Sequence, residues 1–160
     1  MSSNFFTAGG LAKLRNQIKD LERLIKVDIP RDLATAAAHG DLRENAEYQA
    51  AKEKQAFSMT RLRELRERVR NPEVVRIQDF PEDIVTLLKR VRIRDVETGE
   101  EEEYIILGDG DTDLEKDIIS YQSPLAASLI GHKKGEVVEA ELPGGSRSLE
   151  ILDFDFVEGV

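Results

Sequence analysis

The sequence predicts an α+β protein in which an N-terminal antiparallel coiled-coil hairpin of helices precedes a small mixed domain. Apolar residues recur at alternating spacings of three and four through the first half of the 160-residue chain. The pair Asn71-Pro72 then ends the helical pattern. Beyond it, apolar and polar residues alternate in short runs, as they do in strands. The predicted domains are residues 1–75 and 76–160.

The two parts differ in charge. Residues 1–75 hold 14 Lys/Arg and 11 Asp/Glu, whereas residues 76–160 hold 9 and 21, so the parts carry +3 and −12 of the net −9. A general nucleic-acid coat needs a basic surface, and this balance argues against one. The division indicates either two parts with different partners or two unrelated solvated surfaces.

Several features favour a soluble, cytoplasmic protein. The chain has no cysteine, so neither a disulfide framework nor thiolate chemistry is predicted. Its first residues, MSSNFFTAGG, lack the basic region and long apolar run of a secretory signal. No stretch approaches the ~18 apolar residues of a membrane span.

The first helical pattern follows a coiled-coil seam. Thr7 or a neighbour could cap its start, and Gly9-Gly10 are expected in a loop before it. Pro30 lacks an N–H and crowds the preceding turn, so a kink or break is expected near Val27–Pro30. The seam residues are Leu11, Leu14, Ile18, Leu21 and Ile25.

A second pattern of the same kind predicts a helix that runs antiparallel to the first, because the link between them is short. Alanines near the link allow the two helices to approach closely, and the arm reaches roughly 40 Å at the rise of an α-helix. A plain stabilising coiled coil is an alternative interpretation. The pattern comprises Tyr48, Ala51, Gln55, Ser58, Leu62, Leu65 and Val69.

The link itself is acidic. Gly40 is placed to end the first helix, with Asp41 at the N-cap of the second and Glu44 three residues on, as in an acidic capping box. The same spacing places both carboxylates on one face at the end of the arm. Such oxygen ligands suit Mg²⁺, although two carboxylates could only complete a site whose other ligands belong to a partner. A cap and a metal-binding role both remain open.

The second half predicts a short helix on an antiparallel sheet. Ser123-Pro124 has the N-cap and N1 pattern of a helix start, and Gly131 a helix end. Glu97–Glu100 reads as a hairpin turn. Asp109, Asp111 and Asp113 fail as a calcium loop, because the sixth and twelfth positions are not Gly and Glu, and a solvated loop is expected. The predicted strands are 74–77, 88–96, 103–107, 137–142 and 148–156.

The run GDLRENAEY, followed by Ala50-Ala51-Lys52, resembles the signature of the Gre family of bacterial transcript-cleavage factors, in particular its GreA branch. The resemblance extends over nearly the whole chain and implies an FKBP-like fold for the second domain. The residues before Gly40, Ala36–His39, are less charged than is usual in the family. Further matching segments are Ile119-Ser120, Ser123–Ala126, Leu129–Gly131 and Pro143–Gly145.

The resemblance implies a function in trans. The hairpin would enter the secondary channel of bacterial RNA polymerase, where Asp41 and Glu44 help to hold a second Mg²⁺ at the 3′ end of the nascent RNA. The protein would not be an enzyme itself, but a monomeric cofactor with no small-molecule substrate and no membrane partner. The residues expected to contact polymerase are Leu42, Arg43, Asn45, Lys52, Ser123 and Pro124.

Three alternatives are compatible with such a fold. One is a channel-binding inhibitor of polymerase without cleavage activity, and another is a coiled-coil scaffold. Prolyl isomerisation has little support, because such pockets are aromatic-lined and the second half has few aromatic residues. The role of Glu47 stays open, and so does that of the Arg61–Arg70 surface, for which a salt-bridged solvated face is expected.

Overall fold

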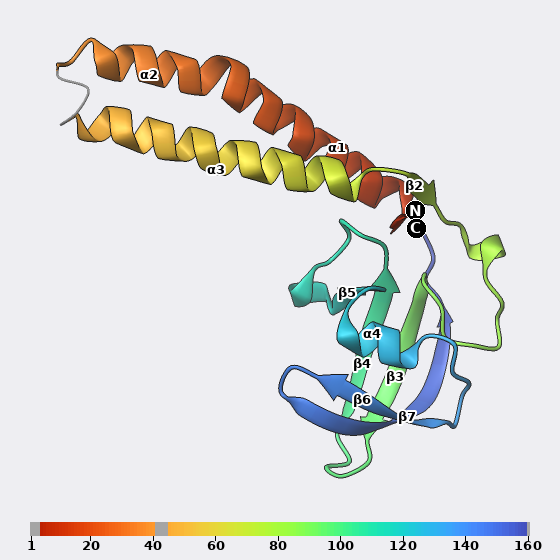
Figure 1. The fold of residues 1–160 in the computed structure, drawn as a ribbon. Coiled ribbons are helices and arrows are strands. Elements are labelled where there is room, and N and C mark those ends of the chain that lie inside the picture. Colours follow the sequence, from red (N-terminus) through yellow and green to blue (C-terminus); the bar gives the residue numbers. More distant parts are fainter. Residues whose placement is uncertain (1–3, 41–44, 160) are drawn as a thin grey trace. The chain divides into compact units, whose positions relative to one another are not determined.

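The computed structural model describes residues 4–40 and 45–159, which form two compact units (Figure 1). One unit is Ala12–Arg70, and the other combines Met1–Leu11 with Asn71–Val160. The N-terminal segment thus groups with the second unit, whereas the division drawn from the sequence placed it in the first. No helix in the described ranges is long and apolar enough to cross a membrane.

The first unit is the predicted helical hairpin. One arm consists of α1 (Ala8–Arg23), a π-helical turn (Leu24–Asp28) and α2 (Ile29–Ala37), and the other is α3 (Ala46–Arg68). The arms run side by side in opposite directions (Figure 1). The seam predicted from the heptad pattern is confirmed in most positions, since seven of its members are buried and the rest, Leu21, Ile25, Tyr48, Gln55 and Val69, are partly buried. The buried residues of this unit include Leu14, Ile18, Ile29, Ala36, Ala51, Ser58, Leu62 and Leu65.

Thr7 caps the start of α1, as expected. Its Oγ1 accepts a hydrogen bond from Gly10 N at 3.0 Å, and its carbonyl accepts one from Leu11 N at 3.0 Å. The loop predicted at Gly9-Gly10 is wrong, because both glycines lie in the first turn of α1. A Cβ on Gly10 would lie 2.7 Å from the Asp111 carboxylate oxygens, so glycine serves close approach here.

The expected break near Pro30 is a π-helical turn instead. Ile29 N donates to Leu24 O, a bond that spans five residues, and the chain stays helical into α2. Pro30 lies in the first turn of α2, where a missing N–H leaves no α-helical bond unmade. The π-helical turn therefore absorbs the proline without ending the arm.

The second unit contains a five-stranded sheet with the order β5-β4-β3-β7-β6. All neighbours are antiparallel except β4 and β5, and α4 (Pro124–Leu129) packs on one face (Figure 1). This arrangement confirms the α+β prediction. The strands are β3 (Lys89–Asp95), β4 (Glu101–Leu107), β5 (Ile118–Ser120), β6 (Val137–Leu142) and β7 (Gly145–Phe156).

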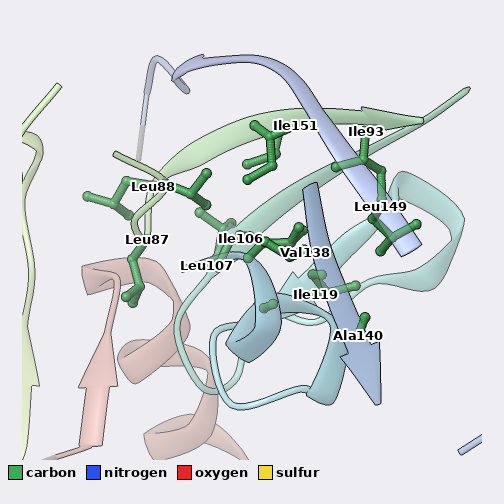
Figure 2. Packing of buried hydrophobic residues seen from close by; sticks show 14 of the residues in the cluster. Leu87, Leu88, Ile93, Ile106, Leu107, Ile119, Val138, Ala140, Leu149 and Ile151 are labelled. Atoms are coloured by element: carbon green, nitrogen blue, oxygen red, sulfur yellow. The ribbon is translucent and has the colours of Figure 1, made fainter. Parts of the chain in front are cut away.

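One hydrophobic core joins the sheet to α4. Figure 2 shows side chains from neighbouring strands gathered together, with Ile93, Ile106 and Ile151 each completely buried. Ala126 and Leu129 bring the buried face of α4 into the same cluster. Truncation of such a core residue to alanine costs about 2–5 kcal/mol, so this cluster accounts for much of the unit's stability.

A separate two-stranded parallel sheet was not predicted. β1 (Asn4–Phe6) pairs with β2 (Pro72–Val74), with Phe6 opposite Val74. The strand expected at Val74–Ile77 lies closer to the N-terminus, because β2 is the segment that pairs with β1. In the sequence, the whole hairpin is therefore inserted between two strands that pair within the second unit.

Lys89 is buried at the start of β3. Its Nζ donates to Pro81 O at 2.6 Å and lies 5.0 and 4.5 Å from the ring centres of Phe154 and Phe156. Burial lowers the pKa of Lys89, because the charged ammonium loses its water. The carbonyl and the two aromatic faces replace part of that hydration.

The predicted turn at Glu97–Glu100 is confirmed and rests on Asp95. The Asp95 carboxylate accepts hydrogen bonds from Glu97 N at 2.9 Å and Thr98 N at 3.1 Å, and from Arg147 Nε at 3.0 Å. The hydrogen bond from Thr98 N, followed by that from Arg147, holds the pKa of Asp95 below its ordinary 3.8. The charged carboxylate is thus the form that the fold stabilises.

Asp95→Asn is expected to lower stability at neutral pH, with the deficit shrinking in acid. A depressed folded-state pKa contributes stability that is present above the unfolded value of 3.8 and lost as pH falls through the folded value. Urea unfolding at several pH values measures the deficit. Asp155→Asn, the same change at an exposed position of β7, is the control. A deficit unchanged from neutral pH to pH ~2 would contradict this linkage.

Candidate functional site

The described end of the hairpin is built from the last turn of α2 and the first turn of α3. Ala38 N and His39 N donate to Ala34 O and Ala36 O at 3.2 and 3.1 Å, which closes the last turn of α2. Gly40 follows with φ of 144°, a backbone conformation that residues other than glycine rarely adopt. The first arm therefore ends where the sequence predicted, within about one turn of Gly40.

The two predicted catalytic and metal-binding acids, Asp41 and Glu44, lie outside the described residues, as do Leu42 and Arg43. Their place in the chain is the four-residue connection between Gly40 and Asn45. The contact predicted for each of them with polymerase or Mg²⁺ stays a prediction. Gly40 and Asn45, the described residues on either side, mark the two ends of this connection.

The N-cap of α3 is Asn45, not Asp41. Asn45 Oδ1 accepts hydrogen bonds from Glu47 N at 3.0 Å and Tyr48 N at 3.1 Å, and Asn45 O accepts one from Gln49 N at 3.0 Å. The predicted capping box is wrong because α3 begins four residues later than expected, after an equally good capping residue. The cap of α3 therefore no longer accounts for Asp41 and Glu44.

Asn45 also reaches across the hairpin. Its Nδ2 donates to Ala36 O, on the opposite arm, at 2.5 Å. One side chain thus caps α3 and binds a carbonyl in the last turn of α2. Sequence reasoning predicted only a contact with polymerase for this residue, although an Asn before a helical run is itself an N-cap signal.

Next to Asn45, the side chains along the seam between the two helices are small. Ala36 and Ala51 are buried where the two helices approach. A hollow of ≈ 380 Å³ next to them is lined by Asp32 and Glu47, one acid from each arm, and by Lys54. In the described ranges, no three His, Cys, Asp or Glu side chains are close enough to hold a metal ion together. Lys52, another predicted contact, is exposed on α3.

Three of the arginines between Arg61 and Arg70 lie in ion pairs. Arg66 contacts Glu22 on the opposite arm at 3.3 Å, and Arg61 contacts Glu64 at 3.6 Å on the same helix. A further pair, of the same i,i+3 kind, joins Arg70 and Glu67 at 3.6 Å. These contacts confirm the expected salt-bridged, solvated face.

In the second unit, Ser123 and Pro124 start α4 as predicted. Ser123 Oγ accepts a hydrogen bond from Ala126 N at 3.3 Å, and Gly131, after the helix, has φ of 90°. Pro124 is exposed at the N-terminal end of α4. The predicted contact of these two residues with polymerase stays a prediction.

Asp109 and Asp111, expected in a solvated loop, instead bind the N-terminal segment, one through its backbone N–H and the other through its carboxylate. Asp109 N donates to Phe5 O at 3.0 Å, and Asp111 accepts from Thr7 Oγ1 at 2.8 Å. Phe5 N in turn donates to the Tyr121 hydroxyl at 3.1 Å. This part of the chain is a docking site for β1.

Comparison with known proteins agrees with this architecture. The family model for the N-terminal domain of transcription elongation factors matches residues 4–74, and the C-terminal model of GreA/GreB elongation factors matches residues 80–156. Transcription elongation factor GreA of Rickettsia felis is 38% identical over 159 residues, 99% of this chain and 98% of its own. GreA of Brucella anthropi is 39% identical over 151 residues, 94% of this chain and 96% of its own.

Solved structures give a weaker likeness. The GreA homologue Gfh1 of Thermus thermophilus is 18% identical, with a TM-score of 0.43 over 96% of this chain and 99% of its own. The family models and the curated relatives, which cover both units, define the class as transcription elongation factors. The chain belongs to the GreA/GreB family.

Proposed function

We propose that this elongation factor rescues backtracked bacterial RNA polymerase by stimulating hydrolytic cleavage at the 3′ end of the nascent RNA. One observation supports the proposal above the others. Asn45 caps α3, so the structural explanation of Asp41 and Glu44 as a helix cap is removed. Two carboxylates in the connection at the end of a long arm suit delivery to a site on another molecule.

The chemistry fits a shared Mg²⁺. This ion binds oxygen ligands, keeps several waters and needs only one or two protein carboxylates, so Asp41 and Glu44 suffice if polymerase supplies the rest. The bound ion supplies a nucleophilic water and charge stabilisation in a two-metal hydrolysis. Polymerase cuts the RNA, and this protein acts as a cofactor, not an enzyme. The Mg²⁺ would not be stably bound by the protein alone.

The hairpin is suited to the secondary channel of polymerase. Its seam near the end is formed by Ala36 and Ala51, so the arm is thin there. In the proposal, Leu42, Arg43 and Lys52 contact the channel. Ser123 and Pro124 contact its rim from the second unit. The protein acts in the cytoplasm as a monomer, with the nascent RNA as its second partner.

The test uses a stalled, backtracked elongation complex whose RNA is labelled at its 5′ end. Addition of the purified protein with Mg²⁺ is expected to shorten the RNA, and the shortened RNA should resume elongation when nucleotides are added. EDTA should stop the shortening, since the metal is essential. Unshortened RNA together with blocked nucleotide addition would overturn the proposal and indicate a channel-binding inhibitor.

A further inference from the structure

We propose that Asn45 is a positioning residue, which holds the two ends of the acidic connection at a fixed separation through its bond to Ala36. This inference rests on the proposed function, because it concerns how Asp41 and Glu44 are presented to polymerase. It gives the half-buried Asn45 a role within the hairpin, in place of the contact with polymerase predicted from the sequence.

The geometry of one side chain carries the argument. The Asn45 amide uses its oxygen and its nitrogen for different arms of the hairpin: Oδ1 accepts from Glu47 N and Tyr48 N at 3.0 and 3.1 Å, and Nδ2 donates to Ala36 O at 2.5 Å. Ala36 is buried and its carbonyl also accepts from His39 N at 3.1 Å. The last turn of α2 and the first turn of α3 therefore share a hydrogen-bonded centre.

This centre bounds the connection that carries the acids. Only four residues join Gly40 to Asn45, and each extended residue spans at most ~3.5 Å, so the separation of the two ends restricts where the carboxylates can lie. A shared metal ion tolerates little misplacement of its ligands. Displacement of a reacting group by about 1 Å can cost roughly 10²-fold in rate.

Substitution of Asn45 can remove its bond to Ala36 on the opposite arm without removing its cap of α3. Serine and aspartate are also good N-caps, so either would keep the bonds from Glu47 N and Tyr48 N. An ionised aspartate has no donor for Ala36 O, and serine is too short to replace Nδ2 there. Asn45→Ser and Asn45→Asp therefore remove the cross-arm bond while they retain the cap. The serine variant adds no charge, whereas the aspartate variant adds a carboxylate.

The experiment measures single-turnover RNA cleavage by the full chain over a range of protein and Mg²⁺ concentrations. In both variants the rate at saturating protein is expected to fall roughly tenfold, with half-saturation within about twofold of wild type. The Mg²⁺ concentration needed for half the maximal rate should rise. The matched controls Asn16→Ser and Asn16→Asp change an exposed residue of α1 and should leave all three quantities unchanged.

Amide hydrogen exchange tests the bond between Asn45 and Ala36 without any cleavage assay. Exchange at His39 N should quicken in Asn45→Ser, while Glu47 N and Tyr48 N stay protected. Full saturating rates in both variants, or a loss explained by half-saturation alone, would overturn the positioning role. If wild type itself cleaves nothing, the proposed function fails and the positioning role in catalysis with it. Unchanged exchange at His39 N would separately overturn the role of the bond between Asn45 and Ala36 in holding the two arms together.

Discussion

Replacement of Asp41 and Glu44 together by alanine is expected to abolish stimulated RNA cleavage while polymerase binding stays within about threefold of wild type. The change removes both carboxylates that would hold the shared Mg²⁺, and metal-based charge stabilisation supplies several kcal/mol in the transition state. Each ~1.4 kcal/mol is tenfold in rate, so the loss should be roughly 10²-fold or more. Single-turnover cleavage and competition for polymerase measure the two quantities.

A matched control separates the position of these acids from the total charge of the hairpin. Asp20→Ala combined with Glu53→Ala removes two carboxylates that are exposed on α1 and α3, away from the connection. This control should cleave at the wild-type rate. Wild-type cleavage by the Asp41, Glu44 double variant would refute the shared-metal mechanism, and loss of binding would instead make these acids a docking contact.

Gly108→Ala is expected to destabilise the second unit by about 1–3 kcal/mol, the usual cost of inserting a methyl group into a packed site. A Cβ at residue 108 would lie 2.6 Å from Phe5 O and 2.7 Å from Phe6 Cα, and neither backbone atom can rotate away. The chain must shift, which disturbs the bond from Asp109 N to Phe5 O and the seating of β1. Thermal unfolding followed by near-UV circular dichroism should show the loss.

Gly144→Ala supplies the comparison for this prediction. It makes the same change in the same unit, at the turn before β7, where an added Cβ would meet no atom within 4 Å. Its melting temperature should stay close to that of wild type, whereas Gly108→Ala should melt several degrees lower, at about 2–4 °C per kcal/mol. Equal melting temperatures for the two variants would show that β1 is not tightly packed against Gly108.

The sequence predicted most of the fold because its signals there are local. Ser123 caps α4 through an atom three residues away, and the turn after Asp95 closes within five residues. The heptad seam, including Leu62 and Leu65, likewise repeats over short distances. None of these three predictions requires knowledge of distant parts of the chain.

The errors come from choices that the local sequence leaves open. Asp41 and Asn45 are both good N-caps, and the bond from Asn45 to Ala36 joins residues nine positions apart on different arms. Similarly, Thr7, which caps the start of α1, donates its hydroxyl to Asp111, a residue about a hundred positions later. The pairing of β1 with β2 has the same long-range character, which sequence periodicity does not report.

Because β1 and β2 pair in parallel, the hairpin is an insertion in the sequence between two neighbouring strands of one unit. Parallel neighbours need a crossover of about a dozen residues or more, and residues 12–70 serve as that crossover. Because both ends of the insert return to one pair of strands, whole heptads can be added or removed without altering the sheet. Each heptad per arm changes the reach of the acids by about 10 Å. Arm length is thus a dimension that evolution or engineering can adjust independently of the domain that carries it.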